Sequence, residues 1–259
     1  MPAHDDDSAR KTIQASATAF TIIEYLSENE RAGITEIAGD IDVSKSTVHN
    51  HLKTLEQGEY VTQDDSGRYA LGYRFLTLGG KVRQRSNLYS VAKPEINWLV
   101  EETGESACVA TEEFGRIVYL YQARGEQAVI TDSHTGTRVL PHCTALGKSM
   151  LAHLPEERVD EIIARRGLPK NTENTINSRE ELFEELAETR DRGYAFDDEE
   201  RIEGLRCVGA PVMDDDDEVI GALSVSGPAK RVAGARFREE LPELVRRAVR
   251  VVEMNHTYS

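Results

Sequence analysis

The feature that most constrains the fold is a connection of only two residues, Asp42-Val43, between two helical patterns. Before it, apolar residues over 34–41 recur at helical spacing, and Thr35 is the predicted N-cap. After it, Ser44 is placed to cap a helix that Gly58 ends. Two short helices joined this closely are typical of a helix-turn-helix.

The neighbouring segments extend this motif. A further helical stripe of apolar residues lies over 15–26, ahead of the two short helices. Behind them, 60–62 and 68–71 are strand-like runs on either side of a turn at Asp65-Ser66-Gly67. The order helix, helix, tight turn, helix, hairpin predicts a winged helix-turn-helix, with the hairpin as the wing.

The third helix has a polar face of a kind that suits DNA. Val48 and Leu52 must face the core, and a turn of 100° per residue then puts Asn50 and Lys53 on the outward side. Amide and hydroxyl groups read base edges, and cations meet phosphates. By itself this face is equally typical of a solvated amphipathic helix. Together with the turn and the wing, this face predicts that Arg68 contacts the DNA backbone. The residues of the helix predicted to contact DNA are Ser44, Lys45, Ser46, Thr47, His49, Asn50 and Lys53.

The charge of the chain does not point to nucleic acid. Its formal net charge is −15, and the first 85 residues carry 10 Lys and Arg against 13 Asp and Glu. Acidic residues are spread over the whole sequence, which is typical of proteins from halophiles that accumulate salt. We therefore expect a halophilic microbe as the source, most simply an archaeon, and take the charge as information about solvent rather than ligand.

Composition also bears on the compartment. The three cysteines, Cys108, Cys143 and Cys207, are odd in number and widely spaced, which favours reduced thiols over a disulfide framework. No stretch approaches the roughly 18 apolar residues of a membrane span. The N-terminus lacks the apolar core of a signal peptide. We expect a cytoplasmic protein without membrane contact, beginning with a flexible acidic tail over 1–12.

The rest of the chain alternates strand-like and helical patterns, which predicts an α/β domain. The "VMDDDDEV" segment within it is expected to be a solvated turn between two strands. Predicted strands are 106–112, 116–123, 128–132, 206–214 and 219–228; predicted helices are 145–154, 156–166, 179–192 and 237–254.

Motifs for catalysis are incomplete. The "GKS" at 147–149 resembles the end of a Walker A motif, but His142 stands where that motif requires glycine. No serine lies in a G-x-S-x-G elbow. His142, Cys143, Cys207 and Asp197 are possible zinc ligands, but their spacing matches no common zinc site. We predict neither an enzyme, nor a metal site, nor a cofactor.

Several motifs in one order resemble the IclR family of transcriptional regulators over nearly the whole chain. They are "ITEIAGDIDVSKSTVHNHLKTLEQGEYV", "RYALGYRFLTLG", "PEINWLVEETGESACVA", "LPHCTALGKSMLAHLP", "RDRGYAFDDEERIEGLRCVGAPV" and "VIGALSVSGP". The resemblance implies an α+β protein whose winged helix-turn-helix (13–73) is joined by a linker helix (74–90) to a GAF-like α/β effector-binding domain (91–259). It also implies a DNA operator, a small-molecule effector, and dimers or dimers of dimers.

The resemblance implies an effector pocket. Motif by motif, its lining is Val139, Ala145, Leu146, Asp197, Leu205, Cys207, Ser224 and Ser226. Ser224 and Ser226 are two apart on a strand and point to one face. With Cys207 and the N–H groups of the helix that begins at Thr144, they suit a carboxylate, such as a sugar-acid catabolite. Asp197 would accept a hydrogen bond from a hydroxyl group of the effector, or would select against a second anionic group nearby. Alternatively, the serines satisfy local backbone groups and Asp197 caps a turn.

Two segments leave alternatives open. Ala145 and Leu146 are bulkier than the residues common at these positions in the family, which predicts a shallower or more apolar pocket. The linker over 74–90 mixes apolar and basic residues. It either packs on a partner subunit and reaches the DNA backbone, or is an ordinary connecting helix. The rival function is a ligand- or redox-sensing module whose winged helix binds a protein.

Overall fold

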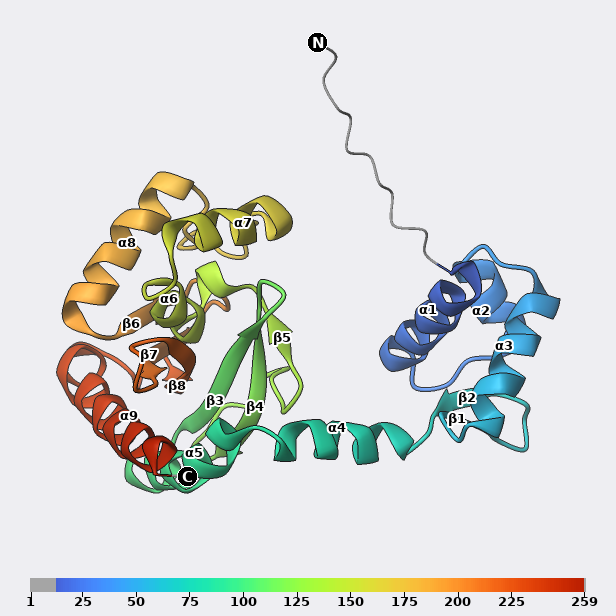
Figure 1. The fold of residues 1–259 in the computed structure, drawn as a ribbon, viewed down its shortest axis with the longest axis horizontal. Helices are drawn as coiled ribbons and strands as arrows, with labels where there is room; N and C mark the ends of the chain where they lie inside the picture. Colours follow the sequence, from blue (N-terminus) through green and yellow to red (C-terminus); the bar gives the residue numbers. More distant parts are fainter. Residues whose placement is uncertain (1–12, 259) are drawn as a thin grey trace, which may run out of the picture. The chain divides into compact units, whose positions relative to one another are not determined.

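The computed structural model describes residues 13–258, so the acidic tail expected over 1–12 lies outside the described residues. The chain divides between Val82 and Arg83 into two compact units, each drawn in Figure 1. Within residues 13–258, no helix is long and apolar enough to cross a membrane.

The first unit is the predicted winged helix-turn-helix. Its core is made by Ile22, Ile37, Val48, Leu52 and Tyr69, which are all buried. The two strands pair antiparallel with Val61 opposite Leu71, which forms the wing. The elements are α1 (Gln14–Glu28), α2 (Ile34–Asp40), α3 (Lys45–Gln57), β1 (Val61–Gln63) and β2 (Tyr69–Leu71).

The helix caps predicted from the sequence are present in this unit, with one exception. Ser44 caps α3, since its Oγ accepts from the Thr47 amide at 3.1 Å, and Gly58 follows the last turn. The prediction that Thr35 caps α2 is wrong. Gly33 is the N-cap, because the Glu36 carboxylate reaches back and accepts from the Gly33 amide at 2.8 Å.

The predicted linker helix over 74–90 is two helices. α4 spans Arg74–Gln84 and α5 spans Asn87–Thr103. Between them Ser86 has an extended backbone, and its Oγ accepts from the Tyr89 amide at 3.3 Å. The serine therefore begins a new helix instead of continuing the old one. None of the α4 side chains is buried, whereas Leu88 and Ile96 of α5 enter the core of the second unit.

The second unit is built on a six-stranded antiparallel sheet in the order β5-β4-β3-β8-β7-β6. Because side chains alternate along a strand, the sheet has two distinct faces. Val109, Val208 and Leu223 pack against α5 and α9 on one face, and Cys108 and Ala222 face α6 on the other. The strands are β3 (Ser106–Glu113), β4 (Arg116–Arg124), β5 (Arg138–Val139), β6 (Ala195–Asp198), β7 (Leu205–Met213) and β8 (Val219–Pro228).

The helices of this unit are close to those predicted: α6 (Ala145–Leu151), α7 (Glu156–Arg166), α8 (Arg179–Arg192) and α9 (Leu241–Thr257), with a short π-helix at Arg236–Glu240 and a 3-10 turn at Pro141–Cys143. The strand predicted over 128–132 is wrong. This segment is a loop in which Ile130 is exposed. The short strands β5 and β6 had no counterpart in the prediction.

Candidate functional site

The predicted reading face lies along one side of α3. Opposite the buried Val48 and Leu52, the exposed residues are Ser46, Asn50 and Lys53, with exposed His49 and half-buried Thr47 beside them; Ser44 and Lys45 are exposed at the start of the helix. The helical period was sufficient to place Ser46, Asn50 and Lys53, whereas Ser44 is the N-cap and Lys45 the first residue of the helix.

Hydroxyl groups at the start of this face are linked. Ser44 Oγ lies 2.9 Å from Ser46 Oγ and 2.8 Å from Thr47 Oγ1. The cap that begins α3 therefore also orients two of the polar side chains of the face. In residues 13–258, no hydrogen bond engages the Asn50 side chain, so its amide is available to a partner.

Two cations of the surface already have partners within the unit. Lys53 Nζ lies 2.7 Å from Glu56 Oε2. Arg68 donates to the Glu36 carboxylate at 3.0 Å and to the Arg31 carbonyl at 2.7 Å, which fastens the wing to α2. Lys45 forms no ion pair with any other described residue.

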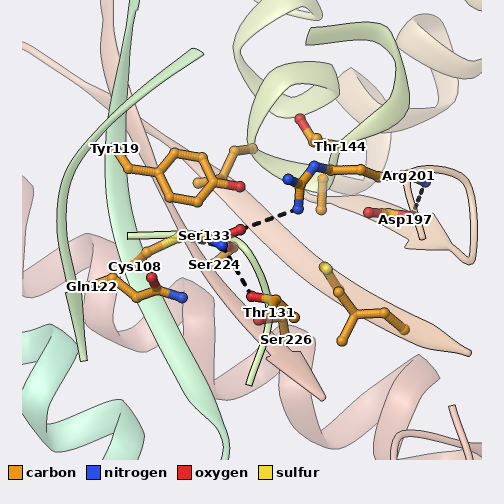
Figure 2. A pocket seen from close by; sticks show the side chains of 14 residues that line it. Cys108, Tyr119, Gln122, Thr131, Ser133, Thr144, Asp197, Arg201, Ser224 and Ser226 are labelled. Atoms are coloured by element: carbon orange, nitrogen blue, oxygen red, sulfur yellow. Dashed lines mark hydrogen bonds between the residues drawn. The ribbon is translucent and has the colours of Figure 1, made fainter. Parts of the chain in front are cut away.

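In the second unit, the sheet register brings the predicted pocket residues together. Asp197 of β6 lies opposite Cys207 of β7, and Cys207 lies opposite Ser226 of β8. Two residues before Ser226 on β8, Ser224 lies opposite Cys108 of β3. The Ser224 Oγ and the Cys108 Sγ are 3.3 Å apart. These residues lie on the face that α6 covers, and they line a pocket (Figure 2).

Seven of the eight predicted residues line this pocket: Ala145, Leu146, Asp197, Leu205, Cys207, Ser224 and Ser226. Val139 is the exception. It is buried in the apolar cluster beside the pocket, next to Leu146 and Met150, because β5 pairs with the outer edge of β4.

A glycine allows α6 to close the pocket. A Cβ built on Gly209 would lie 2.8 Å from the carbonyl carbon of Ala145 and 3.0 Å from the Leu146 amide nitrogen. Real side chains do not tolerate such contacts with backbone atoms. The start of α6 therefore rests directly on β7.

The free space within the pocket is small. Its volume is about 20 Å³, which is room for about one water molecule. A metabolite can enter only if some of the lining side chains move. Thr144, at the start of the helix singled out from the sequence, also lines the pocket, together with six residues that the sequence did not single out: Cys108, Tyr119, Gln122, Thr131, Ser133 and Arg201. Arg201 directly follows the "DDEE" motif, which is the one signal that could have found it.

Burial controls the protonation of the pocket. Asp197 is 2 % exposed and accepts from the Glu200 amide at 2.8 Å. Desolvation, followed by the nearby Glu200 carboxylate, raises the pKa of Asp197 from 3.8 to about 7. Burial likewise raises the pKa of Cys108 to about 11 and that of Cys207 well above its ordinary value. Both thiols are therefore protonated at neutral pH, and a protonated thiol is a poor nucleophile.

Behind the pocket lies a buried ion pair. Lys148 Nζ is 2.5 Å from Glu200 Oε1, and the two side chains are only 2 % and 7 % exposed. The backbone amide of the same Glu200 holds Asp197. The lysine of the "GKS" segment thus has a structural partner in the motif that carries Asp197.

The four side chains considered for zinc do not form one site. Asp197 and Cys207 line the pocket, whereas His142 is not among the lining residues. Its Nε2 lies 3.1 Å from the Pro169 carbonyl oxygen instead. Burial lowers the pKa of His142. In residues 13–258, no group of three or more His, Cys, Asp or Glu side chains is arranged to hold a metal ion.

A winged helix-turn-helix joined to an α/β domain with an internal polar pocket defines a ligand-responsive DNA-binding regulator. Two family models match the chain: the IclR helix-turn-helix domain over residues 17–65, and the C-terminal domain of the bacterial transcriptional regulator IclR over residues 80–254. The chain belongs to the IclR family. It is therefore a DNA-binding transcriptional regulator with a C-terminal effector-binding domain.

Individual relatives cover almost the whole chain. It is 36 % identical over 247 residues to a probable HTH-type transcriptional regulator ArcR of Halobacterium salinarum, a match that covers 94 % of each chain. It is 32 % identical to the transcriptional repressor IclR of Escherichia coli, over 92 % of this chain and 88 % of that protein. The crystal structure of the Thermotoga maritima IclR matches with a TM-score of 0.79 at 29 % identity, over 95 % of this chain and all of that one.

Proposed function

We propose that the outward face of α3 reads the operator sequence and that the pocket of the second unit binds a small carboxylate, such as a sugar acid. The observation that carries the first part is the exposed face of Ser46, Asn50 and Lys53 opposite a fully buried stripe. The observation that carries the second is the row of hydroxyl and thiol groups beneath α6.

Asn50 is the residue on which base reading most depends. An asparagine side chain offers one donor and one acceptor, which match the major-groove edge of adenine. Ser44, Ser46, Thr47 and His49 surround it with further donors and acceptors, whereas the cations of this surface serve phosphates.

Replacing Asn50 by Ala tests this proposal. We expect a loss of about 1–3 kcal/mol on the operator and little change on random DNA, because only base contacts distinguish the two. Fluorescence anisotropy with both duplexes measures the difference. Gln57→Ala, on the same helix but at its C-terminal end, is the matched control. Equal losses on both duplexes would contradict a reading role for Asn50.

The pocket is suited to binding rather than to chemistry. Ser224, Ser226 and Cys207 are potential donors on neighbouring strands, and Asp197 beside them can accept from a ligand hydroxyl when ionised. We propose that no reaction follows binding, since burial keeps the Cys207 thiol protonated. The same protonation disfavours the rival function of a thiol-based redox sensor, and the polar α3 face disfavours a protein partner.

Cys207→Ser tests the assignment of the thiol as a pocket wall. We expect the folded content, by circular dichroism, and operator affinity to be retained, and the response to effector to change, because serine keeps a donor but shortens the side chain. Cys143→Ser, whose thiol lies outside the pocket lining, is the control. Stoichiometric zinc in protein purified without added metal, lost in Cys207→Ser alone, would contradict the assignment.

We also propose that the chain acts in the cytoplasm as a dimer or a dimer of dimers. Support comes from α4 and the residue before it, where large apolar side chains are exposed without a partner in the described chain: Tyr73, Leu76, Leu78 and Val82. A second copy of the same helix would cover them, and basic Lys81 and Arg85 are placed nearby for the DNA backbone.

A further inference from the structure

Arg201 links two distant segments across the pocket. It follows β6, and its side chain reaches the loop that precedes β5, 69 residues earlier in the chain. Its Nη1 donates to Ser133 Oγ at 3.1 Å, and its Nη2 lies 2.9 and 3.0 Å from the two carboxylate oxygens of Asp132. Figure 2 shows the guanidinium pointing to Ser133 and toward the Tyr119 phenol within the pocket.

The two partners of this ion pair lie in different surroundings. The Arg201 side chain is 13 % exposed, whereas that of Asp132 is 71 % exposed. A largely buried guanidinium requires an anion close by, because its charge has lost most of its water. Asp132 can return to solvent at little cost, since it is already mostly hydrated. The structure therefore holds a fixed cation at the pocket and an anion that is easily replaced.

A second arginine holds the same loop in place. Arg124 donates to the Ser133 carbonyl at 2.6 Å and to the Thr131 carbonyl at 3.3 Å. Thr131 and Ser133 line the pocket. The loop is thus anchored by its backbone to β4 and by the Asp132 and Ser133 side chains to Arg201, and only the second anchor competes with a ligand.

We infer that the effector is a dicarboxylate, whose second acidic group binds Arg201 in place of Asp132. The inference rests on the proposed function, which places the first acidic group at Ser224 and Ser226. Arginine pairs with carboxylates in a geometry that neutral groups cannot match. Asp132 is then a built-in competitor that occupies the cation when the pocket is empty.

This exchange also explains how a cavity of about 20 Å³ admits a metabolite. When the ligand carboxylate takes the place of Asp132, the loop loses its ion pair with Arg201 and is held by the Ser133 side chain and by Arg124 alone, which lowers the cost of moving it away from the pocket. The ligand carboxylate and Asp132 cannot both pair with Arg201 in this way at once. Binding of the ligand and the position of the loop that carries Asp132 are therefore coupled as two states of one equilibrium.

Isothermal titration of the full chain with two probes tests the inference. Succinate and butyrate share a four-carbon chain but carry two carboxylates and one, respectively. We expect succinate to bind about tenfold more tightly or better, because only it can form the charge-assisted pair. Arg201→Gln should remove this gap by weakening succinate to the level of butyrate. Arg138→Gln, which breaks an exposed pair with Glu113 outside the pocket, is the control and should leave the gap unchanged.

Asp132→Asn gives a change of opposite sign. Without the competing carboxylate, succinate should bind several-fold more tightly than to the wild type, and butyrate should be unaffected. If succinate and butyrate bind equally tightly, and Arg201→Gln changes neither affinity, the dicarboxylate inference is overturned. The proposed carboxylate pocket would then remain intact. Binding of neither probe, nor of glutarate and valerate, would overturn the carboxylate pocket and the inference with it.

Discussion

Among the described residues, the ion pairs of the first unit keep one or both partners in water, whereas the second unit adds to its exposed pairs one whose two members are both buried. In the first unit, Lys53–Glu56 and Arg68–Glu36 keep both partners substantially in water. In the second unit, Lys148–Glu200 is almost completely buried. Exposed pairs contribute little to stability and can exchange partners, whereas a buried pair cannot lose one member without leaving an uncompensated charge.

This difference matches what each unit does. A surface that meets DNA must release its cations to phosphates, so weak pairs in solvent are suitable there. A domain that encloses a ligand has to fix polar groups in its interior, so its charges need permanent partners. Arg201–Asp132 lies between the two cases, with one buried member and one exposed member. The following experiments test this contrast.

The largest effect is expected for Lys148→Met. The substitution leaves Glu200 buried without its cation, and losing one member of a buried pair costs about 3–5 kcal/mol. Urea unfolding of the full chain measures the loss. Glu200→Gln in the same protein should restore part of it, because the carboxylate closest to Lys148 is then neutral and Glu185, the second partner of Lys148, keeps its pair with Arg192. Lys53→Met, which breaks an exposed pair at a similar distance, should change little. Equal effects of the two lysine variants would remove the contrast between the units.

Asp197 is expected to give the next largest effect, as a dependence of stability on pH. Its pKa rises from 3.8 to about 7 on folding because of desolvation and the Glu200 carboxylate. The folded protein therefore binds this proton more tightly than the unfolded chain, and the free energy of unfolding falls as pH rises between these two values. At 1.36 kcal/mol per pKa unit, the loss is at most roughly 4 kcal/mol.

Asp197→Asn should abolish that decline. Unfolding at about pH 5 and about pH 8 would show a smaller loss in the variant than in the wild type. The contribution of His142 is present in both proteins, whereas Glu200 interacts with Asp197, so the variant removes the coupled contribution of the two carboxylates. Asp198→Asn, on the same strand but paired with Arg206 near the surface, is the control. A variant with the wild-type pH profile would show that Asp197 is ionised throughout this range.

The contrast between the units also explains how much the sequence could predict. The α3 face follows from one helical period, so Ser46, Asn50 and Lys53 were placed correctly on the outward side. The spacing of Ser224 and Ser226 likewise predicted a shared face, and the register adds Cys207 beside them. Local periodicity is sufficient where the candidate residues lie on one element.

Contacts between distant segments could not be predicted in this way. The "AVITD" run has strand propensity, but β4 pairs with β5 instead, and the run becomes the loop that carries Asp132. Propensity is overridden where no neighbouring strand offers hydrogen bonds. Nothing near Arg201 in the sequence indicates a partner 69 residues away. Arg68 shows the same limit, since its pairing with Glu36 depends on how the wing folds against α2.

The smallest effect is expected in the salt dependence of operator binding. Each phosphate neutralised contributes about −0.9 to the slope of log affinity against log salt. Within the described residues, Lys45 is the one cation of α3 that has no ion pair, while Lys53 and, on the wing, Arg68 are paired. Arg10 and Lys11, two further cations near the start of the chain, lie outside the described residues. We expect a slope shallower than the roughly −5 of six phosphate contacts, and specific binding that survives at molar salt.

Operator titrations from about 0.5 M to about 3 M potassium chloride measure this slope, in a range where exposed charges are strongly screened. Glu56→Gln frees Lys53 from its partner and should make the slope steeper by about 0.9 for each chain bound. Glu28→Gln, an exposed residue at the end of α1, should not. If the wild type already shows the steep slope and Glu56→Gln adds nothing, then DNA opens the Lys53–Glu56 pair without cost. The exposed pairs of the first unit would then be reserves of phosphate contacts, and the acidic surface would give no adaptation to salt.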